Sequence, residues 1–252
     1  MTRGGCLGCP SPPHGRVDPQ AGEHRPARAR GEGSPAAPAA AAENRRDAPG
    51  HRAGGDSPSE NCLIVAGFAY RYILTAEGKR QILSFHISGD IPDLQSLHLD
   101  VMDHSLATLV PSSLAFIPHN DLRTLTRNHP RLGDLLWRDT LIDAAVFRQW
   151  MVGLGRRDAY SRIAHLLCEL LVRLRAVELV EDHAFTLPVT QAELGDAFGL
   201  STVHVNRVLQ DLRGNGLISL HGGCLKVLDW EGLQRAGEFD PTYLHLAKKE
   251  AL

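Results

Sequence analysis

Two short helices joined by a glycine turn constrain the fold of this chain more than any other feature of its sequence. Thr190 and Glu193 have the spacing of a capping box, which begins a helix at residue 191. Gly199 supplies a tight turn, and Ser201 can cap a second helix over Thr202–Arg213. The second helix has one apolar stripe, formed by Val205, Val208, Leu209 and Leu212. The pattern predicts a helix-turn-helix.

The opposite face of the second helix carries polar and small side chains that suit DNA recognition. These are Thr202, Val203, His204, Asn206 and Arg207. In a helix-turn-helix, the first residues of the second helix enter the major groove. Residues 216–228 follow as two short strands around Gly222 and Gly223, which predicts a wing. The alternative is an ordinary helical hairpin with a capped second helix, and the wing weighs against it.

Net charge and hydropathy limit the possible partners and location. The 27 Lys and Arg residues nearly balance the 29 Asp and Glu residues, so any attraction for DNA must come from local charge. No apolar run approaches the roughly 18 residues that a membrane span requires, and no apolar stretch behind Arg3 forms a signal peptide. We therefore expect a cytoplasmic protein without a membrane partner.

The region before the helix-turn-helix divides into a β-rich part and a long helix. Asn61–Leu74 and Gln81–Ile87 predict a hairpin, Asp93–Leu99 a short helix, and Ser105–Val110 and Leu114–Ile117 two further strands. These spacings predict a β-roll over residues 58–128. The first 57 residues, rich in Gly, Pro, Ala and Arg, lack the apolar side chains for a core.

After Pro130 the apolar residues recur every three or four positions for about six turns. The stripe contains Leu132, Leu135, Leu136, Thr140, Ala144, Phe147 and Met151. We expect one helix over residues 129–154, ended by Gly153 and Gly155, and a second over Asp158–Val177. At about 1.5 Å per residue the first would be about 35 Å long, which favours packing against a second copy of itself.

From about residue 55 to residue 246 the chain resembles the Crp/Fnr family of transcription regulators. The resemblance rests on the helix-turn-helix and several shorter motifs: Gly67, Ser88-Gly89-Asp90, the long helix, Gly155-Arg156-Arg157 and Arg162-Ile163-Ala164-His165-Leu166-Leu167. It implies an α+β protein with an incomplete β-roll related to cyclic-nucleotide-binding domains, a long dimerisation helix, a winged helix-turn-helix over residues 155–246 and a tail over 247–252.

The function implied is sequence-specific regulation of transcription by a homodimer on a palindromic site. Double-stranded DNA and RNA polymerase are the implied partners, without enzymatic activity, metal or cofactor. The family's base-contacting positions correspond to Thr202, Val203 and Arg207, with Ser201, His204 and Gln191 toward the DNA backbone. Arg207 suits guanine, a phosphate being the alternative, and Val203 replaces a frequent Glu, which favours contact with a thymine methyl group.

The effector region departs from the cyclic-nucleotide-binding members of the family. Those members present Arg-Ser or Arg-Thr where this chain has His104-Ser105, and Asp90 and Asp93 add negative charge nearby. We therefore expect no response to cyclic AMP. A cyclic-nucleotide-responsive activator is the alternative within the family.

Two other kinds of site are weighed against this interpretation. The five cysteines, Cys6, Cys9, Cys62, Cys168 and Cys224, are scattered, so we expect reduced thiols. Cys6 and Cys9 alone do not form a cluster site. The roll histidines, His86, His98 and His104 with Asp100 or Asp103, could suggest a jelly-roll metalloenzyme with an unrelated C-terminal helical domain, but they lack its ligand spacing.

The first 57 residues replace the helix and the first strands that family members have in this position. Without those strands a roll has open edges. We expect that this tract is a wrong reading frame or a misassigned start, joined to the true protein near Gly55-Asp56-Ser57. The alternative is a genuine disordered tail.

Overall fold

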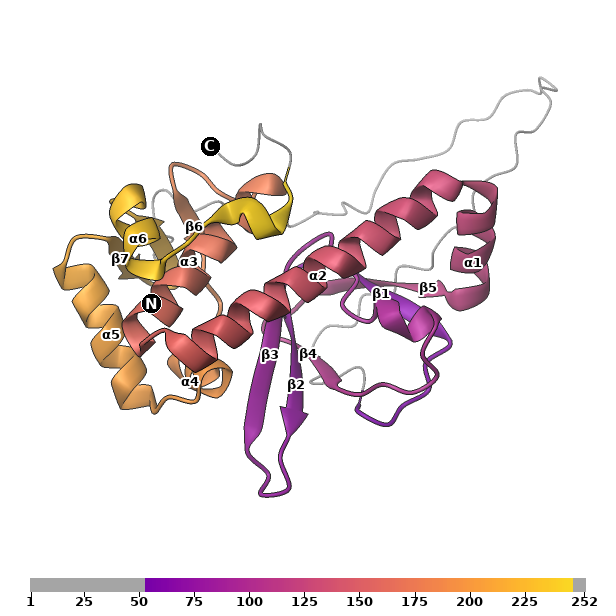
Figure 1. Cartoon of the computed structure of the whole chain (residues 1–252), viewed down its shortest axis with the longest axis horizontal. Helices are drawn as coiled ribbons and strands as arrows, with labels where there is room; N and C mark the ends of the chain where they lie inside the picture. Colours follow the sequence, from indigo (N-terminus) through magenta and orange to yellow (C-terminus); the bar gives the residue numbers. More distant parts are fainter. Residues whose placement is uncertain (1–52, 247–252) are drawn as a thin grey trace, which may run out of the picture.

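The computed structural model describes residues 53–246. Predictions for Cys6, Cys9, most of the first 57 residues and the tail at 247–252 lie outside this range. The expected α+β fold is confirmed, with a β-rich part, a long helix and a C-terminal helical part arranged along one axis (Figure 1). No helix within the described range is both long and apolar enough to cross a membrane.

The β-rich part, hereafter the roll, consists of two small antiparallel sheets. Its elements are β1 (Glu60–Ala66), β2 (Ala69–Leu74), β3 (Arg80–His86), the 3-10 helix η1 (Leu94–Leu97), β4 (Ser105–Thr108) and β5 (Ser113–Pro118). One sheet pairs β1 with β5, and the other has the order β3-β2-β4. β2 and β3 form a long hairpin that projects from the molecule (Figure 1).

The prediction of a single strand over Asn61–Leu74 is wrong, because the chain turns between β1 and β2. Gly67 has φ +116° there, a backbone conformation that favours glycine. A Cβ at this position would lie 2.2 Å from Oγ of Ser112, so the turn depends on a contact with a distant part of the chain.

The long helix α2 (Pro130–Arg156) follows α1 (His119–Asn128), which the sequence analysis did not predict. The expectation that Gly153 and Gly155 end the long helix is wrong, since α2 continues to Arg156 and Arg157 is extended. Gly153 is buried, and a Cβ there would contact the side chain of Arg162, so the glycine serves close packing.

The C-terminal unit contains the remaining elements. They are α3 (Ala159–Ala176), β6 (Ala184–Thr186), α4 (Gln191–Phe198), α5 (Thr202–Gly214), β7 (Ile218–His221), β8 (Cys224–Val227), α6 (Trp230–Gly237) and η2 (Pro241–Leu244). The strands form a sheet of order β6-β8-β7. The fully buried side chains of α3, among them Leu167 and Leu170, lie at the centre of the main hydrophobic core.

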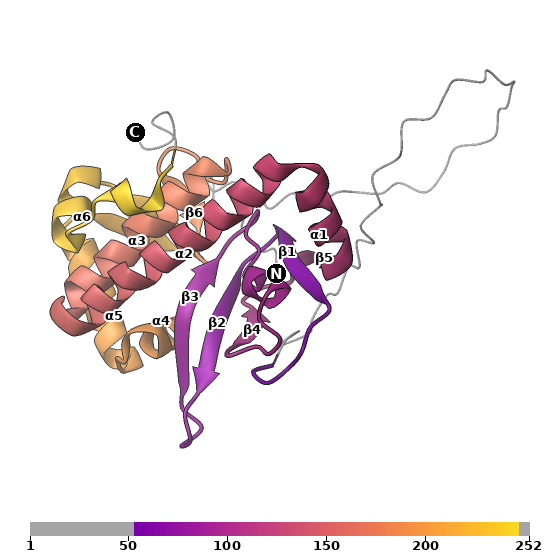
Figure 2. The same cartoon turned by 45° about the vertical axis from the view of Figure 1, so that its right-hand side comes forward.

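The roll and the C-terminal unit pack against each other along α2 (Figure 2). Aromatic rings join the three parts: the centroids of Phe85 on β3 and Trp150 on α2 are 5.8 Å apart, and Trp150 is 5.5 Å from Phe198 on α4. The main core therefore extends from the C-terminal unit through α2 into one side of the roll.

Candidate DNA-binding interface

The first helix of the predicted helix-turn-helix, α4, is capped by its own residues. The Thr190 hydroxyl accepts a hydrogen bond from the Glu193 amide at 3.2 Å, and the Glu193 carboxylate accepts one from the Thr190 amide at 2.7 Å. The predicted capping box is therefore present. Gly199 ends the helix with φ +65°, and a Cβ on Gly195 would lie 2.6 Å from the Leu200 carbonyl oxygen. The tight turn therefore requires glycine at both positions.

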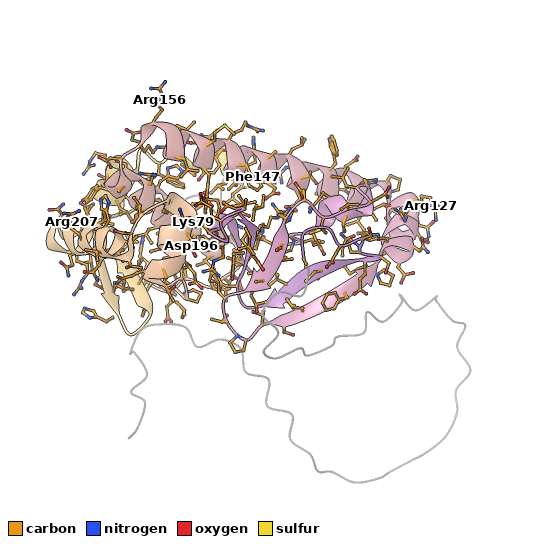
Figure 3. All side chains as sticks on the ribbon, turned by 90° about the horizontal axis from the view of Figure 1, so that it is seen from below. Lys79, Arg127, Phe147, Arg156, Asp196 and Arg207 are labelled. Atoms are coloured by element: carbon orange, nitrogen blue, oxygen red, sulfur yellow. The ribbon has the colours of Figure 1, made fainter. Side chains whose placement is uncertain are left out.

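The second helix, α5, begins as predicted at Ser201, whose hydroxyl accepts a hydrogen bond from the His204 amide at 3.2 Å. The predicted apolar stripe is buried: Val205, Val208, Leu209 and Leu212. Thr202, Val203 and Arg207 are exposed, and the Val203 side chain is 76% exposed. Arg207 lies at the outer surface of α5 at one end of the molecule (Figure 3).

The remaining predicted DNA contacts are partly buried. Gln191 at the start of α4, His204 and Asn206 are half-buried, and Asn206 accepts a hydrogen bond from Gln210 at 2.9 Å. The two wing strands, β7 and β8, are joined by Gly222 and Gly223, both with positive φ. The structure thus presents one capped helix start, a short wing and few charges on this surface.

A cavity of about 830 Å³ lies between the roll, α2, α3 and the chain segment after η2. Asp90 and His104, which the sequence analysis placed in an effector pocket, are part of its wall, whereas Asp93 and Ser105 are not. Asp93 is fully buried, and its carboxylate accepts a hydrogen bond from the Cys62 amide at 2.7 Å. The Ser105 hydroxyl accepts one from the Gly54 amide. The prediction that Asp93 and Ser105 line an effector pocket is therefore wrong.

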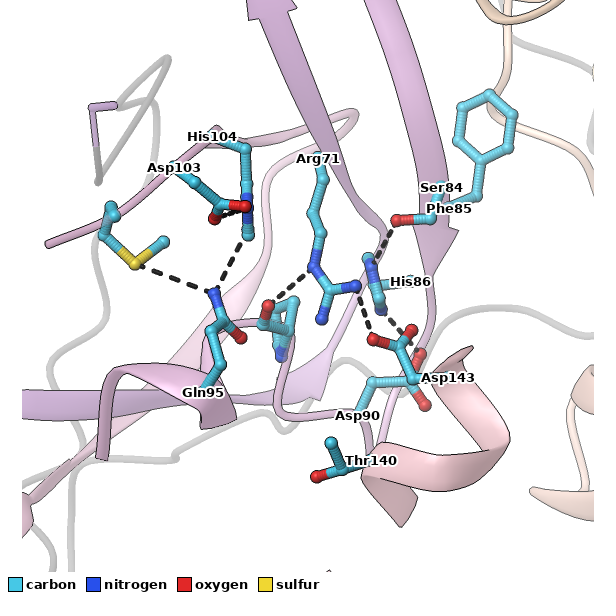
Figure 4. A network of polar contacts seen from close by, with 12 residues as sticks. Arg71, Ser84, Phe85, His86, Asp90, Gln95, Asp103, His104, Thr140 and Asp143 are labelled. Atoms are coloured by element: carbon cyan, nitrogen blue, oxygen red, sulfur yellow. Dashed lines mark hydrogen bonds and ion pairs between the residues drawn. The ribbon is translucent and has the colours of Figure 1, made fainter. Parts of the chain in front are cut away.

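Two arginines in this cavity were missed by sequence reasoning. Arg71 on β2 donates to the Pro92 carbonyl at 2.7 Å and to the Asp143 carboxylate on α2 at 2.6 Å (Figure 4). Arg173 on α3 pairs with Asp90 at 2.7 Å. Each arginine interrupts a short apolar stretch of the sequence, and this interruption could have indicated a buried polar site. The repulsion of a phosphate by Asp90, expected from the sequence, is offset by Arg173.

Buried titratable groups in the cavity wall have shifted pKa values. Burial, and then the positive charge of Arg71, lowers the pKa of His86 to about 4. Burial opposes ionisation of Asp90, but Arg173 and His86 together lower its pKa to about 2. Burial and Arg71 also lower the pKa of His104, whose ring contacts Asp103 at 2.7 Å. At neutral pH the network therefore contains ionised Asp90 beside neutral histidines.

The histidines considered for a metal site lie in different environments. His98 is exposed, His86 contacts Ser84 and Asp90, and His104 contacts Asp103 and Gln95. Within residues 53–246 no three His, Cys, Asp or Glu side chains gather where they could hold one metal ion.

The outer face of α2 differs from the stripe expected for dimerisation. Leu136 packs against η1 and α1, and the Phe147 ring lies 5.7 Å from the Arg71 guanidinium, so both face the roll. The apolar side chains exposed on α2 are Leu135, Trp137, Leu141, Met151, Val152 and Leu154. Trp137, Leu141, Ala144, Arg148 and Met151 follow a spacing of four and three residues, which is that of a coiled-coil seam.

Comparison with known proteins agrees with this geometry. The Crp-like helix-turn-helix domain matches residues 161–236. The chain is 28% identical over 179 residues to the transcriptional activator FnrA of Stutzerimonas stutzeri, covering 71% of this chain and 73% of that protein. It is 29% identical over 175 residues to the activator Anr of Pseudomonas aeruginosa, covering 69% and 71%.

Solved structures give the same fold. FixK2 of Bradyrhizobium japonicum superposes with a TM-score of 0.69 at 22% identity, covering 76% of this chain and 93% of that one. A regulator from Thermus thermophilus superposes with a TM-score of 0.54 at 18% identity, covering 78% and 96%.

Proposed function

Since this chain belongs to the Crp/Fnr family of DNA-binding transcription regulators, we propose that it acts as a homodimer that reads a palindromic site through the start of α5. The observation that carries the proposal is the exposed first turn of α5, capped by Ser201 and continued by Arg207, in a helix-turn-helix whose two helices each begin with a side-chain cap. Because a bacterial-type regulator must reach the chromosome, we place it in the cytoplasm.

Arg207 is the proposed base-reading residue. A guanidinium that binds guanine O6 and N7 contributes about 1–3 kcal/mol of discrimination. Thr202 and Val203 lie one turn earlier, where a hydroxyl and a methyl-contacting side chain can reach adjacent bases. Ser201, His204, Asn206 and Gln191 flank them, in positions suited to phosphates.

Selection from random DNA tests this assignment. Arg207→Ala should lose preference for one guanine in each half-site and about 1–3 kcal/mol of affinity for the preferred site. Ser201→Ala should weaken binding to all sequences alike. Arg213→Ala, a control at the exposed end of α5, should select the same motif as the wild type. An unchanged motif from Arg207→Ala would show that this side chain contacts the DNA backbone.

The proposed dimer interface is the outer seam of α2. Its exposed apolar side chains, among them Met151 at 72% and Trp137 at 66% exposure, would be removed from water by a second copy of the same helix. Two recognition helices related by two-fold symmetry would then face half-sites about one DNA turn apart.

Light scattering and DNA binding test the dimer. Trp137→Glu combined with Met151→Glu should give monomers with little affinity for a palindrome, while Arg127→Glu on α1, at the far end of the molecule (Figure 3), should remain dimeric. A dimer that survives both seam substitutions would exclude this interface.

The names of two relatives support one direction of regulation. FnrA and Anr are named activators, so we propose activation, with RNA polymerase as the partner. The test is transcription in vitro with purified polymerase from a promoter carrying the selected site. Reduced transcript in the presence of the protein would identify a repressor.

We expect no response to cyclic AMP. His104 lacks the paired donors of a guanidinium, and Arg71 is already engaged by Asp143 and the Pro92 carbonyl. Titration calorimetry should show no binding at micromolar nucleotide. Binding that is lost in Arg71→Met would mean that Arg71 exchanges Asp143 for a phosphate.

A further inference from the structure

The roll contacts the helix-turn-helix directly, at the C-terminal end of α4. Nε and Nη2 of Arg80, the first residue of β3, lie 2.8 and 2.7 Å from Oδ2 of Asp196. The next residue, Gln81, donates from its side-chain amide to the Ala197 carbonyl at 2.9 Å. In each of these two pairs, the partners are 116 residues apart in sequence.

These contacts provide hydrogen-bond and ion-pair partners for polar groups at the C-terminal end of α4. The last carbonyls of a helix have no partner within it, and this end carries a partial negative charge. In α4, Gln81 binds the Ala197 carbonyl, and Arg162 of α3 binds the Phe198 carbonyl at 2.9 Å. Arg80 adds a positive charge beside Asp196, in the last turn.

The two ends of α4 are therefore stabilised in different ways. Its start is capped by the neighbouring Thr190 and Glu193, whereas its end depends on α3 and the roll. A helix of eight residues is marginal without such contacts. The end of α4 leads through Gly199 directly to Ser201, the cap of the DNA-reading helix.

Arg80 is held in place from the roll side. Its Nη1 donates to the Tyr70 hydroxyl at 2.8 Å, and its guanidinium lies 5.2 Å from the centroid of the Tyr70 ring. Because Tyr70 is buried in the main core, its ring and hydroxyl hold the Arg80 guanidinium in one position. The aromatic contacts from Phe85 through Trp150 to Phe198 support the same junction.

We propose that Arg80 is a positioning residue for DNA binding: the roll completes the helix-turn-helix by capping α4 with Arg80 and Gln81. The inference rests on the proposed function and adds that DNA affinity depends on a residue of the sensor part that touches no DNA. A displacement of β3 would then change the end of α4 and the start of α5.

Fluorescence anisotropy on the selected DNA site tests the proposal with two neutral variants and one control. Arg80→Gln and Asp196→Ala should each weaken binding about threefold to fivefold, the range of a partly exposed ion pair. Asp196→Ala is the sharper test, because removing a negative charge near DNA would strengthen binding if only direct electrostatics mattered. Lys79→Ala, a control that removes the neighbouring exposed charge, should bind within twofold of the wild type.

Charge reversal supplies the decisive comparison. Arg80→Asp and Asp196→Arg alone should each lose more affinity than the neutral variants, and the double variant should bind more tightly than either. Thermal unfolding measured in parallel should show all variants folded at the assay temperature. Additive losses in the double variant, or tighter binding by Asp196→Ala, would overturn the proposal.

The failure of this inference is distinguishable from that of the proposed function. If Arg207→Ala loses the guanine preference while the Arg80 and Asp196 variants bind like the wild type, the function stands and the positioning role is refuted. If the wild-type protein selects no DNA site, the proposed function itself fails.

Discussion

The helix caps of the C-terminal unit and the polar contacts of the roll differ in the sequence distance between their partners. In the C-terminal unit, the caps join residues three positions apart, as in Asp158 with Ser161 and Ser201 with His204. In the roll, two of the polar contacts, Asn61 with Asp93 and Asp90 with Arg173, join residues 32 and 83 positions apart. Local pattern thus determines the helix caps of the C-terminal unit, whereas tertiary packing determines these contacts of the roll.

The hydrophobic cores differ in the same way. The core of the C-terminal unit is one large cluster around α3. The far side of the roll has a separate cluster of only five buried side chains: Cys62, Ile64, Ala69, Leu106 and Leu114. Since burial of apolar area is the main stabilising contribution, the roll depends more on its contacts with α2 and α3.

The junction at Arg173 should give the largest effect. Glu169 is completely buried and its positive partner is Arg173 at 3.2 Å, which also binds Asp90 of the roll. Arg173→Met leaves the Glu169 charge buried without a cation, so the free energy of unfolding should fall by about 3–5 kcal/mol in chemical denaturation.

Two further variants isolate the cause of that loss. Arg175→Met, on the same helix, should change stability little, since the hydrogen bond of its side chain within residues 53–246 is to the exposed His183. Glu169→Gln in the Arg173→Met background should recover part of the lost stability, because the buried charge is then gone. No recovery would mean that packing of the arginine stem, and not charge, holds the junction.

The roll should also be the acid-sensitive region. Burial and Arg71 lower the pKa of His86 to about 4, against an ordinary value of 6.5. Because the unfolded chain takes up the proton first, this stability is complete above pH 6.5 and is lost as the pH falls toward 4. The loss should be about 2–3 kcal/mol.

Unfolding free energies measured at several pH values for the wild type and His86→Gln check this expectation. The variant should show a flatter decline between pH 6.5 and 4, with the remaining slope coming from other groups such as His104 and His165, whose pKa values are also lowered. Asp90 should contribute only below pH 4, because its pKa is about 2. Identical pH profiles would show that the pKa of His86 is the same in the folded and the unfolded protein.

The turn of the helix-turn-helix should respond to a single methyl group. In Gly195→Ala the new Cβ would lie 2.6 Å from the Leu200 carbonyl oxygen, so the backbone must shift, at a cost of about 1–3 kcal/mol. Gly214→Ala at the end of α5 meets no atom within 4 Å and should be neutral or slightly stabilising. Equal stability of the two variants in thermal unfolding would show that the turn is not tightly constrained.

The smallest effect is expected at the cap of α5. Ser201→Ala removes the hydroxyl that accepts the His204 amide, which should lower the unfolding free energy by about 1 kcal/mol. Ser161→Ala is the matched control, because Ser161 contributes only its backbone amide to the cap of α3. If Ser201→Ala cost as much as Arg173→Met, the contrast between local and distant interactions would be lost.

Sequence reasoning succeeded where neighbouring residues decide the structure. The capping box at Thr190, the turn at Gly199 and the inward stripe from Val205 to Leu212 were all predicted and are present. The strand pattern of residues 61–74 did not show the break at Gly67, which only the family resemblance placed after the first strand, and the close approach of Ser112 to this glycine is a contact between distant residues. Periodicity also could not tell which face of α2 meets the roll, so Leu136 and Phe147 were assigned to the wrong side.

The candidate sites show the same limit. The residues expected on the surface of α5 are exposed or half-buried, since helix geometry places them there. Arg71 and Arg173 join the cavity only through tertiary contacts with Asp143 and Asp90, which no local pattern contains. Asp93 was misplaced for the corresponding reason, because its carboxylate caps the backbone of β1 instead of facing the cavity.

The length of α2, 27 residues, means that a small tilt at one end produces a large displacement at the other. At 1.5 Å per residue the helix is about 40 Å long, and the C-terminal unit begins at the end farther from α1. A tilt of about 5° at the roll end would displace the other end by about 3.5 Å, which is close to the axial rise of one base pair in DNA, about 3.4 Å. In the proposed homodimer, a small change in the angle between the two α2 helices would therefore alter by about one base pair the half-site spacing that the two recognition helices fit.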